Sequence, residues 1–452
     1  MSEKKPVEQT SDRISSLRKQ MNSGTMLAAR RMLNALHPAE IADLLESLPT
    51  RERKVVWEMV DPSFDGEVLI ELGEEAREAL LADMDKAEVL AATEHLDADD
   101  FADLLMSLPE TVIQETLLSM DKQRLAQVEA VLSYPEDTAG GLMDLDVVTV
   151  RPDVTVDVVL RYLRHLGELP YNTDRIIVVD RFTRYLGTLP LQKLLVSDLD
   201  DSVAEVMDWK EEPISVNTPD IEVARLFRNR DLISAPVVNE KNELIGRVTV
   251  DDVVDVIVEE ADRSVLHMAG LQEDMDIFSP ILRSTRRRAI WLGINLFTAF
   301  LAAFVIGLFE ATIQHVVALA VLMPIVASMG GIAGSQTLTL VIRAQALGQI
   351  GRGNFRVLLN REVFIGFLNS LLWALVVAVV AYLWFHDIRI GAIIATALII
   401  NQLAAAFSGV IIPVILDRMG IDPAVAGSVI LTTVTDVTGF FAFLGIATLV
   451  LM

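Results

Sequence analysis

The chain of 452 residues contains no cysteine. Disulfide bonds and thiolate metal sites are therefore excluded, in agreement with a cytosolic setting for its soluble part. Its six histidines are scattered without metal-ligand spacing, and neither a Gly-x-Ser-x-Gly elbow nor a Gly-x-x-x-x-Gly-Lys loop occurs. These absences argue against a membrane-bound enzyme and a nucleotide-driven pump, so we expect a protein that is not an enzyme.

Lysine is absent from residues 283–452, where 10 arginines face only 6 acidic residues. Residues 1–282 hold the remaining 28 basic and 57 acidic residues, which gives a formal charge of −29 there and +4 in the second part. Such asymmetry indicates two environments rather than one globule. An acidic soluble region repels nucleic acid and attracts cations, so we expect no nucleic-acid partner.

Five apolar stretches are long enough to cross a lipid bilayer, which requires roughly 20 residues each. They cover approximately residues 289–309, 316–342, 363–385, 391–416 and 424–451. Charged residues are absent between Glu362 and Asp387 and between Arg389 and Asp417. We therefore expect a multi-pass protein of the inner (plasma) membrane with five helical spans.

The arginines predict the orientation of these spans, because positive flanks stay on the cytoplasmic side. Arg418 follows the fourth span, and the opposite side offers only Arg389. Eight more arginines precede the first span or lie between the second and third: Arg283, Arg286, Arg287, Arg288, Arg343, Arg352, Arg356 and Arg361. No apolar run follows the first five residues, so we expect no cleavable signal, a cytoplasmic N-terminus and an outside C-terminus. An odd number of spans favours a homodimer with its pathway on the two-fold axis.

The last span carries one carboxylate, Asp436, and no other span has a basic residue at comparable depth. A charge there costs roughly 2.5–3.5 kcal/mol, so it needs compensation. Ser428, Thr432, Asp436 and Gly439 follow one another at helical steps on one face. This polar stripe predicts a cation path. The alternative is a protonated Asp436 bonded to a neighbouring helix.

The second span, "PIVASMGGIAGSQTLTL" from Pro324, is unusually rich in small and polar residues, including Gly330, Gly331 and Gln336. Two interpretations remain open. Small residues permit close helix packing. Alternatively, irregular backbone and polar groups line a water-filled path.

The soluble part divides into regions of different texture. Residues 1–24 are expected to be a flexible tail, and residues 25–135 an acidic helical domain. There "AEIADLLESLP" at 39–49 returns as "DDFADLLMSLP" at 99–109, an offset of 60, which predicts stacked helical repeats. Residues 136–258 show strands alternating with helices in two copies, about 138–200 and 201–258.

A connecting helix is expected over residues 251–280, before the membrane domain of residues 283–452. Its acids crowd one face and the border of that face: Asp252, Asp255, Glu259, Glu260 and Asp262. Such a face repels other acidic surfaces, and bridging divalent ions would favour a compact arrangement. The alternative is an ordinary solvated acidic helix.

The double pattern of a strand, Gly-x-x-Thr-x-x-Asp and a helix resembles a CBS-domain pair. With the helical stack, the arginine cluster, "SMGGIAGSQ" and "TTVTDVTGF", nearly the whole chain resembles the MgtE magnesium channel family. The resemblance implies an all-α N-terminal superhelix, an α/β tandem CBS pair, a connecting plug helix and a five-helix transmembrane domain, assembled as a homodimer.

The resemblance also implies roles for individual residues. Asp436 matches the pore carboxylate that binds hydrated Mg²⁺, with Thr432 and Ser428 beside it. Pro324, Gly330, Gly331 and Gln336 match the second pore helix, although Ile332 and Ser335 stand where the family places Asn. Asp252, Asp255 and Glu260 match the family's cytosolic sensing acids. The crowded face adds Glu259 and Asp262 to the expected set, with Asp97 and Asp100 as partners in the helical domain.

The implied function is a Mg²⁺-selective channel that imports magnesium down its gradient and closes when cytosolic Mg²⁺ binds the acidic surfaces. Co²⁺, Mn²⁺ and Ca²⁺ are expected as weaker ligands. The alternative is an ion-coupled divalent cation carrier or exporter of Mg²⁺ or Co²⁺. Gly246, Thr249 and Asp252 have the spacing of a CBS nucleotide site, so ATP is a further candidate ligand, whereas "GTLPLQK" in the first copy lacks the Asp.

Overall fold

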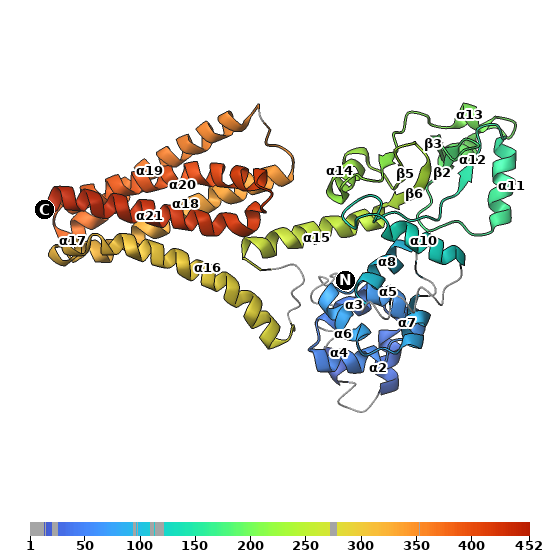
Figure 1. Ribbon diagram of the computed structural model, residues 1–452, viewed down its shortest axis with the longest axis horizontal. Helices are drawn as coiled ribbons and strands as arrows, with labels where there is room; N and C mark the ends of the chain where they lie inside the picture. Colours follow the sequence, from blue (N-terminus) through green and yellow to red (C-terminus); the bar gives the residue numbers. More distant parts are fainter. Residues whose placement is uncertain are drawn as a thin grey trace, which may run out of the picture. The chain divides into compact units, whose positions relative to one another are not determined.

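The computed structural model describes residues 13, 15–19, 26–93, 96, 98–108, 113, 122–271, 278–351 and 353–452 (Figure 1). These residues form two compact units. The first comprises the described residues up to Ala261 together with residues 278 and 279. The second comprises residues 262–271 and the described residues from Pro280 to Met452.

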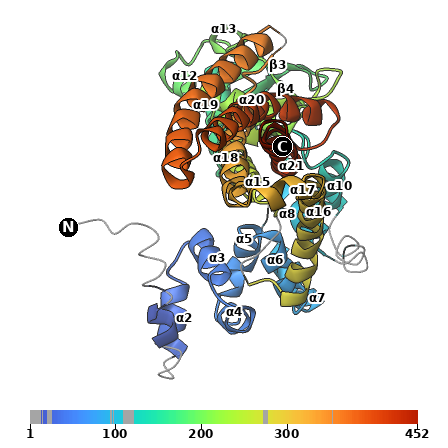
Figure 2. The same ribbon diagram turned by 90° about the vertical axis from the view of Figure 1, so that its left-hand side faces the viewer.

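The first unit begins with short helices that lie in one group (Figure 2). They are α2 (Met26–Leu33), α3 (Pro38–Glu46), α4 (Thr50–Trp57), η1 (Pro62–Phe64), α5 (Asp65–Ile70), α6 (Glu74–Leu81), α7 (Lys86–Thr93), α8 (Ala98–Met106) and α10 (Lys122–Leu132). Their apolar faces meet in a core around Leu44, Leu69 and Phe101. The predicted repeat appears as α3 and α8, whose bounds differ by 60 residues. Leu17, in the expected flexible tail, is also fully buried in this core.

Two arginines close the ends of helices in this stack. The last carbonyl groups of a helix lack intrahelical partners and carry partial negative charge. Arg53 donates from Nε to the carbonyl of Leu45 at 2.9 Å. Arg77 donates from Nη2 to the carbonyls of Ile70 at 2.8 Å and Leu72 at 2.9 Å. Each side chain therefore satisfies the C-terminal end of the helix before its own.

Two small sheets of identical topology follow, each with one parallel and one antiparallel pairing. The first copy contains β1 (Thr149–Val150), α11 (Val156–Leu166), β2 (Arg175–Val179), β3 (Tyr185–Pro190), α12 (Leu191–Val196) and α13 (Val203–Val206). The second contains β4 (Ile214–Ser215), α14 (Asp220–Arg230), β5 (Ser234–Val238) and β6 (Leu244–Thr249). A register shift falls at Val178/Val179 and again at Val237/Val238. The predicted tandem α/β fold is confirmed.

The two copies are joined by equivalent hydrogen bonds at their hairpins. The N–H of Leu244 donates to the carbonyl of Thr183 at 2.8 Å, and the N–H of Tyr185 donates to the carbonyl of Asn242 at 2.9 Å. Thr183 and Asn242 both adopt positive φ, 59° and 61°. The copies therefore pack as a pseudo-symmetric pair. β6 continues directly into α15 (Val250–Met268), and residues 272–277 of the expected connecting segment lie outside the described residues.

The second unit contains five helices that are long and apolar enough to cross a membrane. They are α16 (Ile281–Gly307), α18 (Ala318–Ala346), α19 (Phe355–Phe385), α20 (Ile388–Arg418) and α21 (Pro423–Leu451), with the short α17 (Glu310–His315) after α16. α20 packs against α18, α19 and α21. In the most apolar stretch of α20, 50% of the residues are buried, whereas the corresponding share is 11% in α16 and in α19. α20 therefore forms the centre of this unit. The predicted order of a helical domain, a tandem α/β pair and five long apolar helices is confirmed.

Candidate functional site

The contacts between α18 and α21 fix the level at which Asp436 lies. The Cβ position of Gly439 faces Val326, that of Gly334 faces Leu431, and that of Gly427 faces Leu338. α18 and α21 therefore run antiparallel in close contact. This register places Asp436, one turn before Gly439, near the level of Gly330 on α18.

Asp436 lies in the middle of α21 and is half-buried. The described residues include no charged side chain that pairs with it. Thr432, one turn earlier, is exposed and donates its hydroxyl to the carbonyl of Ser428 at 2.9 Å. The predicted polar stripe of Ser428, Thr432 and Asp436 is thus present on one helix, and a partly exposed carboxylate lies at its centre.

The predicted residues of α18 have different surroundings. The helix is continuous through Pro324 and the glycine pair, so of the two interpretations left open, the structure does not show an irregular backbone. Gly330 is buried against α20, whereas the Cβ position of Gly331 meets nothing within 4 Å. Pro324 and Gln336 are exposed on the unit. Close packing through small residues therefore accounts for Gly330, whereas Gly331 and Gln336 have open surroundings on different sides of α18.

Asn401 of α20 is a buried polar residue that the sequence analysis missed. It is 0% exposed, and its Nδ2 donates to the carbonyl of Val326 at 2.9 Å. The same amide lies against Gly330 of α18 and Gly439 of α21. A signal existed, because "NQ" at positions 401 and 402 interrupts an otherwise apolar run.

In the first unit, acids of the helical stack influence acids at the start of α15. The charge of Asp100 on α8 contributes to a raised pKa of Asp252. The charge of Glu71, which follows α5, does the same for Asp255. The charge of Glu259 likewise raises the pKa of Asp103 of α8. The structure therefore brings together the predicted acids Asp252, Asp255, Glu259 and Asp100, and adds Glu71 and Asp103 to them.

The crowding of these carboxyl groups changes their ionisation. Burial, with the neighbouring Asp251, raises the pKa of Asp252 to about 8. Burial and Glu136 raise the pKa of Asp103 to about 6, against the lowering effect of Arg77. Partial removal from water and Glu71 raise the pKa of Asp255 to about 6, although that side chain keeps an exposed surface. The surface therefore resists full ionisation at neutral pH.

Asp97, Glu260 and Asp262 are the remaining predicted sensing residues. Asp97 lies outside the described residues. Glu260 is half-buried, and Asp262 is exposed on the part of α15 that belongs to the second unit. Among the residues that the structure describes, no group of three or more His, Asp or Glu has a geometry that could hold a metal ion directly.

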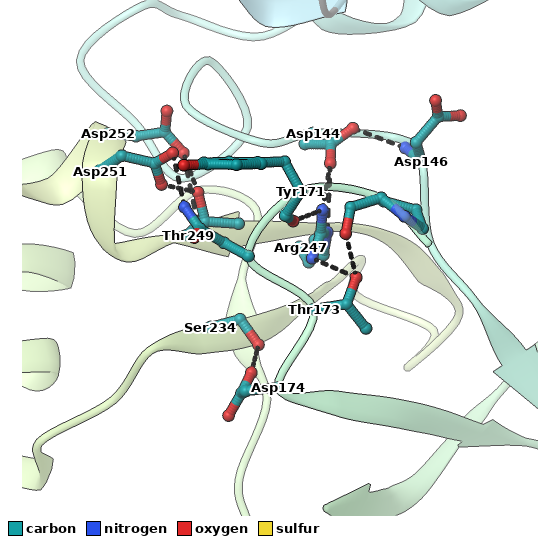
Figure 3. Close-up of polar contacts among 12 residues, drawn as sticks. Asp144, Asp146, Tyr171, Thr173, Asp174, Ser234, Arg247, Thr249, Asp251 and Asp252 are labelled. Carbon is teal, nitrogen blue, oxygen red and sulfur yellow. Dashed lines mark hydrogen bonds and ion pairs between the residues drawn. The ribbon is translucent and has the colours of Figure 1, made fainter. Parts of the chain in front are cut away.

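The candidate nucleotide residues lie where β6 meets α15 (Figure 3). Thr249 ends β6, and its hydroxyl donates to Asp252 at 3.0 Å while its N–H donates to the same carboxylate at 3.3 Å. Asp252 therefore also caps the first turn of α15. Asn172 donates to Asp251 at 2.8 Å. Figure 3 shows the exposed Tyr171 extending toward Asp251 and Asp252.

A buried ion pair lies beside this corner. Arg247 of β6 donates from Nη2 to Asp144 at 2.9 Å and to the carbonyl of Tyr171 at 2.7 Å (Figure 3). Both charged side chains are nearly fully buried. Burial raises the pKa of Asp144, although Arg247 acts to lower it. The loop that carries Tyr171 is therefore tied to β6.

The first copy has a different corner at the equivalent position. In the two registers, Arg175 pairs with Pro190 and Ser234 pairs with Thr249. Proline has neither the hydroxyl nor the N–H that Thr249 uses. The sequence predicts that the two copies differ in ligand-binding residues. The strand registers agree with this, because Pro190 occupies in the first copy the position that Thr249 occupies in the second.

Within the second unit, the last turn of α15 contacts the start of α21. The Nδ1 atom of His267 lies 2.5 Å from Oδ2 of Asp422. The other oxygen of Asp422 accepts the N–H of Ala424 at 2.8 Å and so caps α21. Gly270, with φ of 70°, lies directly against the indole of Trp291. The helix that carries the acids is therefore attached to the helix that carries Asp436.

Comparisons with known families match most of the chain. Residues 323–446 match MgtE, described as a divalent cation transporter. Residues 36–137 match the MgtE intracellular N domain, and residues 139–199 and 203–259 match the CBS domain. These matches confirm the resemblance found in the sequence.

Individual relatives agree with the family matches. The chain is 31% identical to the magnesium transporter MgtE of Thermus thermophilus over 96% of this chain and 98% of the relative. It is 28% identical to the magnesium transporter MgtE of Bacillus subtilis over 95% of each. A solved cytosolic domain of the Mg²⁺ channel MgtE in complex with ATP is 35% identical, with a TM-score of 0.49, and covers 54% of this chain and 99% of its own.

Proposed function

Because this chain belongs to the MgtE family of divalent cation transporters, we propose that it is a Mg²⁺ channel rather than an enzyme. Relatives that match nearly its full length are named magnesium transporters, which supports Mg²⁺ as the transported ion. The five apolar helices make it a multi-pass membrane protein. The arginine distribution favours the inner membrane with a cytoplasmic N-terminus and an outside C-terminus, so transport down the gradient is import.

The lone carboxylate of Asp436 carries this proposal. Mg²⁺ requires octahedral oxygen ligands and gives up water reluctantly. A half-exposed carboxylate without a charged partner among the described residues can hold the ion through its water shell. In a homodimer, two such groups would face the same path on the two-fold axis. The hydroxyls of Thr432 and Ser428 line the same face of α21, toward the cytoplasmic end.

The acids of the first unit are proposed to sense cytosolic Mg²⁺. Asp252, Asp255, Glu259 and Asp100 repel one another when ionised, and Mg²⁺ bound through water between them would relieve that repulsion. Mg²⁺ closes the channel only to the degree that it binds the compact state more tightly. Glu260, Asp262 and Asp97 are proposed as additional acids of this response.

The attachment of α15 to α21 supports the route by which sensing reaches the pore. Asp422 caps α21, which carries Asp436, and contacts His267 at the end of α15. A displacement of α15 would therefore pull or push on Asp422 and so shift the first turn of α21, the proposed pore helix. Gly270 against Trp291 adds a second contact between the connecting segment and α16.

ATP is proposed as a ligand of the second CBS copy. Thr249 and Asp252 offer a hydroxyl and a carboxylate to a ribose, whereas the predicted Gly246 is buried against the carbonyl of Asp144. Tyr171 extends from the other side with an exposed aromatic ring (Figure 3). The first copy, with Pro190 in place of Thr249, is not expected to bind a nucleotide.

Uptake into proteoliposomes tests the proposed function. Purified full-length protein is reconstituted in vesicles that contain a Mg²⁺ indicator, and Asp436→Asn is compared with the wild type. The control is Asp417→Asn, at the end of α20. We expect Mg²⁺ uptake by the wild type and by the control, and no uptake by Asp436→Asn. Equal uptake by Asp436→Asn and the wild type would refute the proposal, and uptake only under a proton or sodium gradient would establish the coupled carrier or exporter instead. Co²⁺, Mn²⁺ and Ca²⁺ are expected to compete only weakly.

A further inference from the structure

α20 carries an amide side chain at the centre of the membrane unit. Asn401 lies in the middle of this 31-residue apolar helix and is completely buried. An amide in such surroundings is costly unless it is hydrogen-bonded. Its presence at a completely buried position therefore requires a physical reason.

The Nδ2 group of Asn401 meets two other helices. It donates to the carbonyl of Val326 on α18 at 2.9 Å. A Cβ atom at Gly330 of α18 would lie 2.2 Å from Nδ2, and a Cβ atom at Gly439 of α21 would lie 2.6 Å from it. Both distances are far below van der Waals contact. The amide thus occupies a space that exists only because both helices have glycine there.

The second polar atom of the amide is less well satisfied. Oδ1 of Asn401 is buried and accepts no hydrogen bond from the described residues. A leucine or an alanine at this position would avoid the cost of an unsatisfied oxygen. The positions one turn away on either side are in fact buried alanines, Ala397 and Ala405. Packing alone therefore does not explain an asparagine at this position. The donor on Nδ2 is the feature that an apolar residue would lack.

The contacts lie close to the candidate pore carboxylate. Gly439 is three residues after Asp436, and Gly330 is near the level of Asp436 on α18. We propose that Asn401 is a positioning residue that fixes the face of α21 bearing Asp436 relative to α18. This inference rests on the proposed Mg²⁺ transport. It assigns to α20 a role in setting how tightly the permeating ion is held.

Replacement by leucine tests the role of the amide. Asn401→Leu retains the branched shape of the side chain, although leucine is larger, and loses the donor to Val326. One interhelical hydrogen bond in a membrane contributes enough to change the half-saturating Mg²⁺ concentration by about three- to tenfold. We expect such an increase, with little change in the amount of folded protein. A purely structural role would instead reduce the folded protein and leave half-saturation of the remainder unchanged.

A double-mutant cycle tests the contact with α21. Gly439→Ala should impair Mg²⁺ uptake in the wild-type background, because its Cβ would collide with Nδ2 of Asn401. In the Asn401→Ala background the same change should have little further effect, since the colliding atoms are gone. Gly445→Ala is the matched control on α21, because its Cβ would meet only Phe309, at 3.9 Å.

The outcomes separate this inference from the proposed function. Absence of wild-type Mg²⁺ uptake would refute the proposed function itself. Wild-type uptake together with unchanged half-saturation in Asn401→Leu, or additive effects of Gly439→Ala and Asn401→Ala, would overturn the positioning role. If Asn401→Leu fails to fold, half-saturation is measured for Asn401→Ala. Failure of both variants to fold would show a structural role only, which also overturns the inference.

Discussion

Acidic residues are arranged in opposite ways in the two units of this chain. In the first unit, carboxyl groups crowd together where α5 and α8 meet the start of α15, and their pKa values rise. In the second unit, Asp436 has no charged partner among the described residues. A crowded set changes state when cations or protons arrive, whereas a lone carboxylate offers the same weak hold to each passing ion. The first arrangement suits sensing and the second suits conduction.

Neutralising Asp436 should have the largest effect and should leave the first unit unaffected. We expect Asp436→Asn to abolish measurable Mg²⁺ uptake, a loss of at least about tenfold, because the charge that holds the hydrated ion is lost. The absence of native cysteine allows paired spin labels on cysteines introduced at the exposed Ser63 and Val254. Their separation should respond to Mg²⁺ as in the wild type. A changed response would show that the two acidic regions are not separate in function.

Neutralising the crowded acids should give the reverse pattern. Asp252→Asn combined with Asp255→Asn removes both the repulsion and the proposed Mg²⁺ ligands. We expect Mg²⁺ uptake to persist and the Mg²⁺-dependent change in label separation to disappear. Asp198→Asn with Asp200→Asn, two exposed acids away from α15, is the matched control. A normal Mg²⁺ response in the first pair would contradict the proposed sensing surface.

The crowded acids also predict a pH dependence of the first unit without Mg²⁺. Their pKa values are higher in the folded state than in the unfolded chain, so the folded state binds more protons between pH 4 and about 8. The free energy of unfolding should therefore fall as the pH rises through this window. Urea unfolding measures it, followed by the fluorescence of Trp57 in a variant with the other four tryptophans replaced by phenylalanine. Stability that rises from pH 5 to pH 8 would contradict the assignment.

Addition of Mg²⁺ should flatten this pH dependence. The ion competes with protons for the same carboxyl groups, so its stabilising effect should be larger at pH 8 than at pH 5. The Asp252→Asn and Asp255→Asn variant is the control, since it should show a weaker dependence on both pH and Mg²⁺. An equal Mg²⁺ effect at the two pH values would place the bound ion elsewhere.

The smallest expected effect concerns the two CBS copies. Thr249→Val removes a hydroxyl that donates to Asp252, which should lower the free energy of unfolding by about 1 kcal/mol and weaken ATP binding. Thr155→Val is the control in the first copy, because Thr155 makes no side-chain cap hydrogen bond. Calorimetric titration with ATP distinguishes the variants. Equal ATP affinity in both would remove Thr249 from the nucleotide site.

The sequence was sufficient for features that depend on local pattern. Apolar length predicted the five long helices, and internal repeats predicted the stacked helices and the paired sheets. The spacing of acids placed Asp252, Asp255 and Glu259 on one helix. These properties follow from periodicity of 3.6 or 2 residues and from the cost of polar groups in lipid.

Features that depend on contact between distant segments were not predictable in this way. The bond between His267 and Asp422 joins residues 155 positions apart. Asp103 belongs to the acid cluster through the packing of α8, whereas the sequence favoured Asp97 and Asp100. Asn401 was visible as a polar residue in an apolar run, but its partners Val326, Gly330 and Gly439 follow only from the arrangement of three helices.

Electrical recording of the full-length protein in planar bilayers tests the central claim most directly. Mg²⁺ is the only permeant cation, and its concentration is raised on the cytosolic face. The division between conducting and sensing acids predicts a Mg²⁺ current that declines as cytosolic Mg²⁺ rises, no current for Asp436→Asn, and a current without decline for Asp252→Asn with Asp255→Asn. Mg²⁺ current through Asp436→Asn equal to that of the wild type would contradict it.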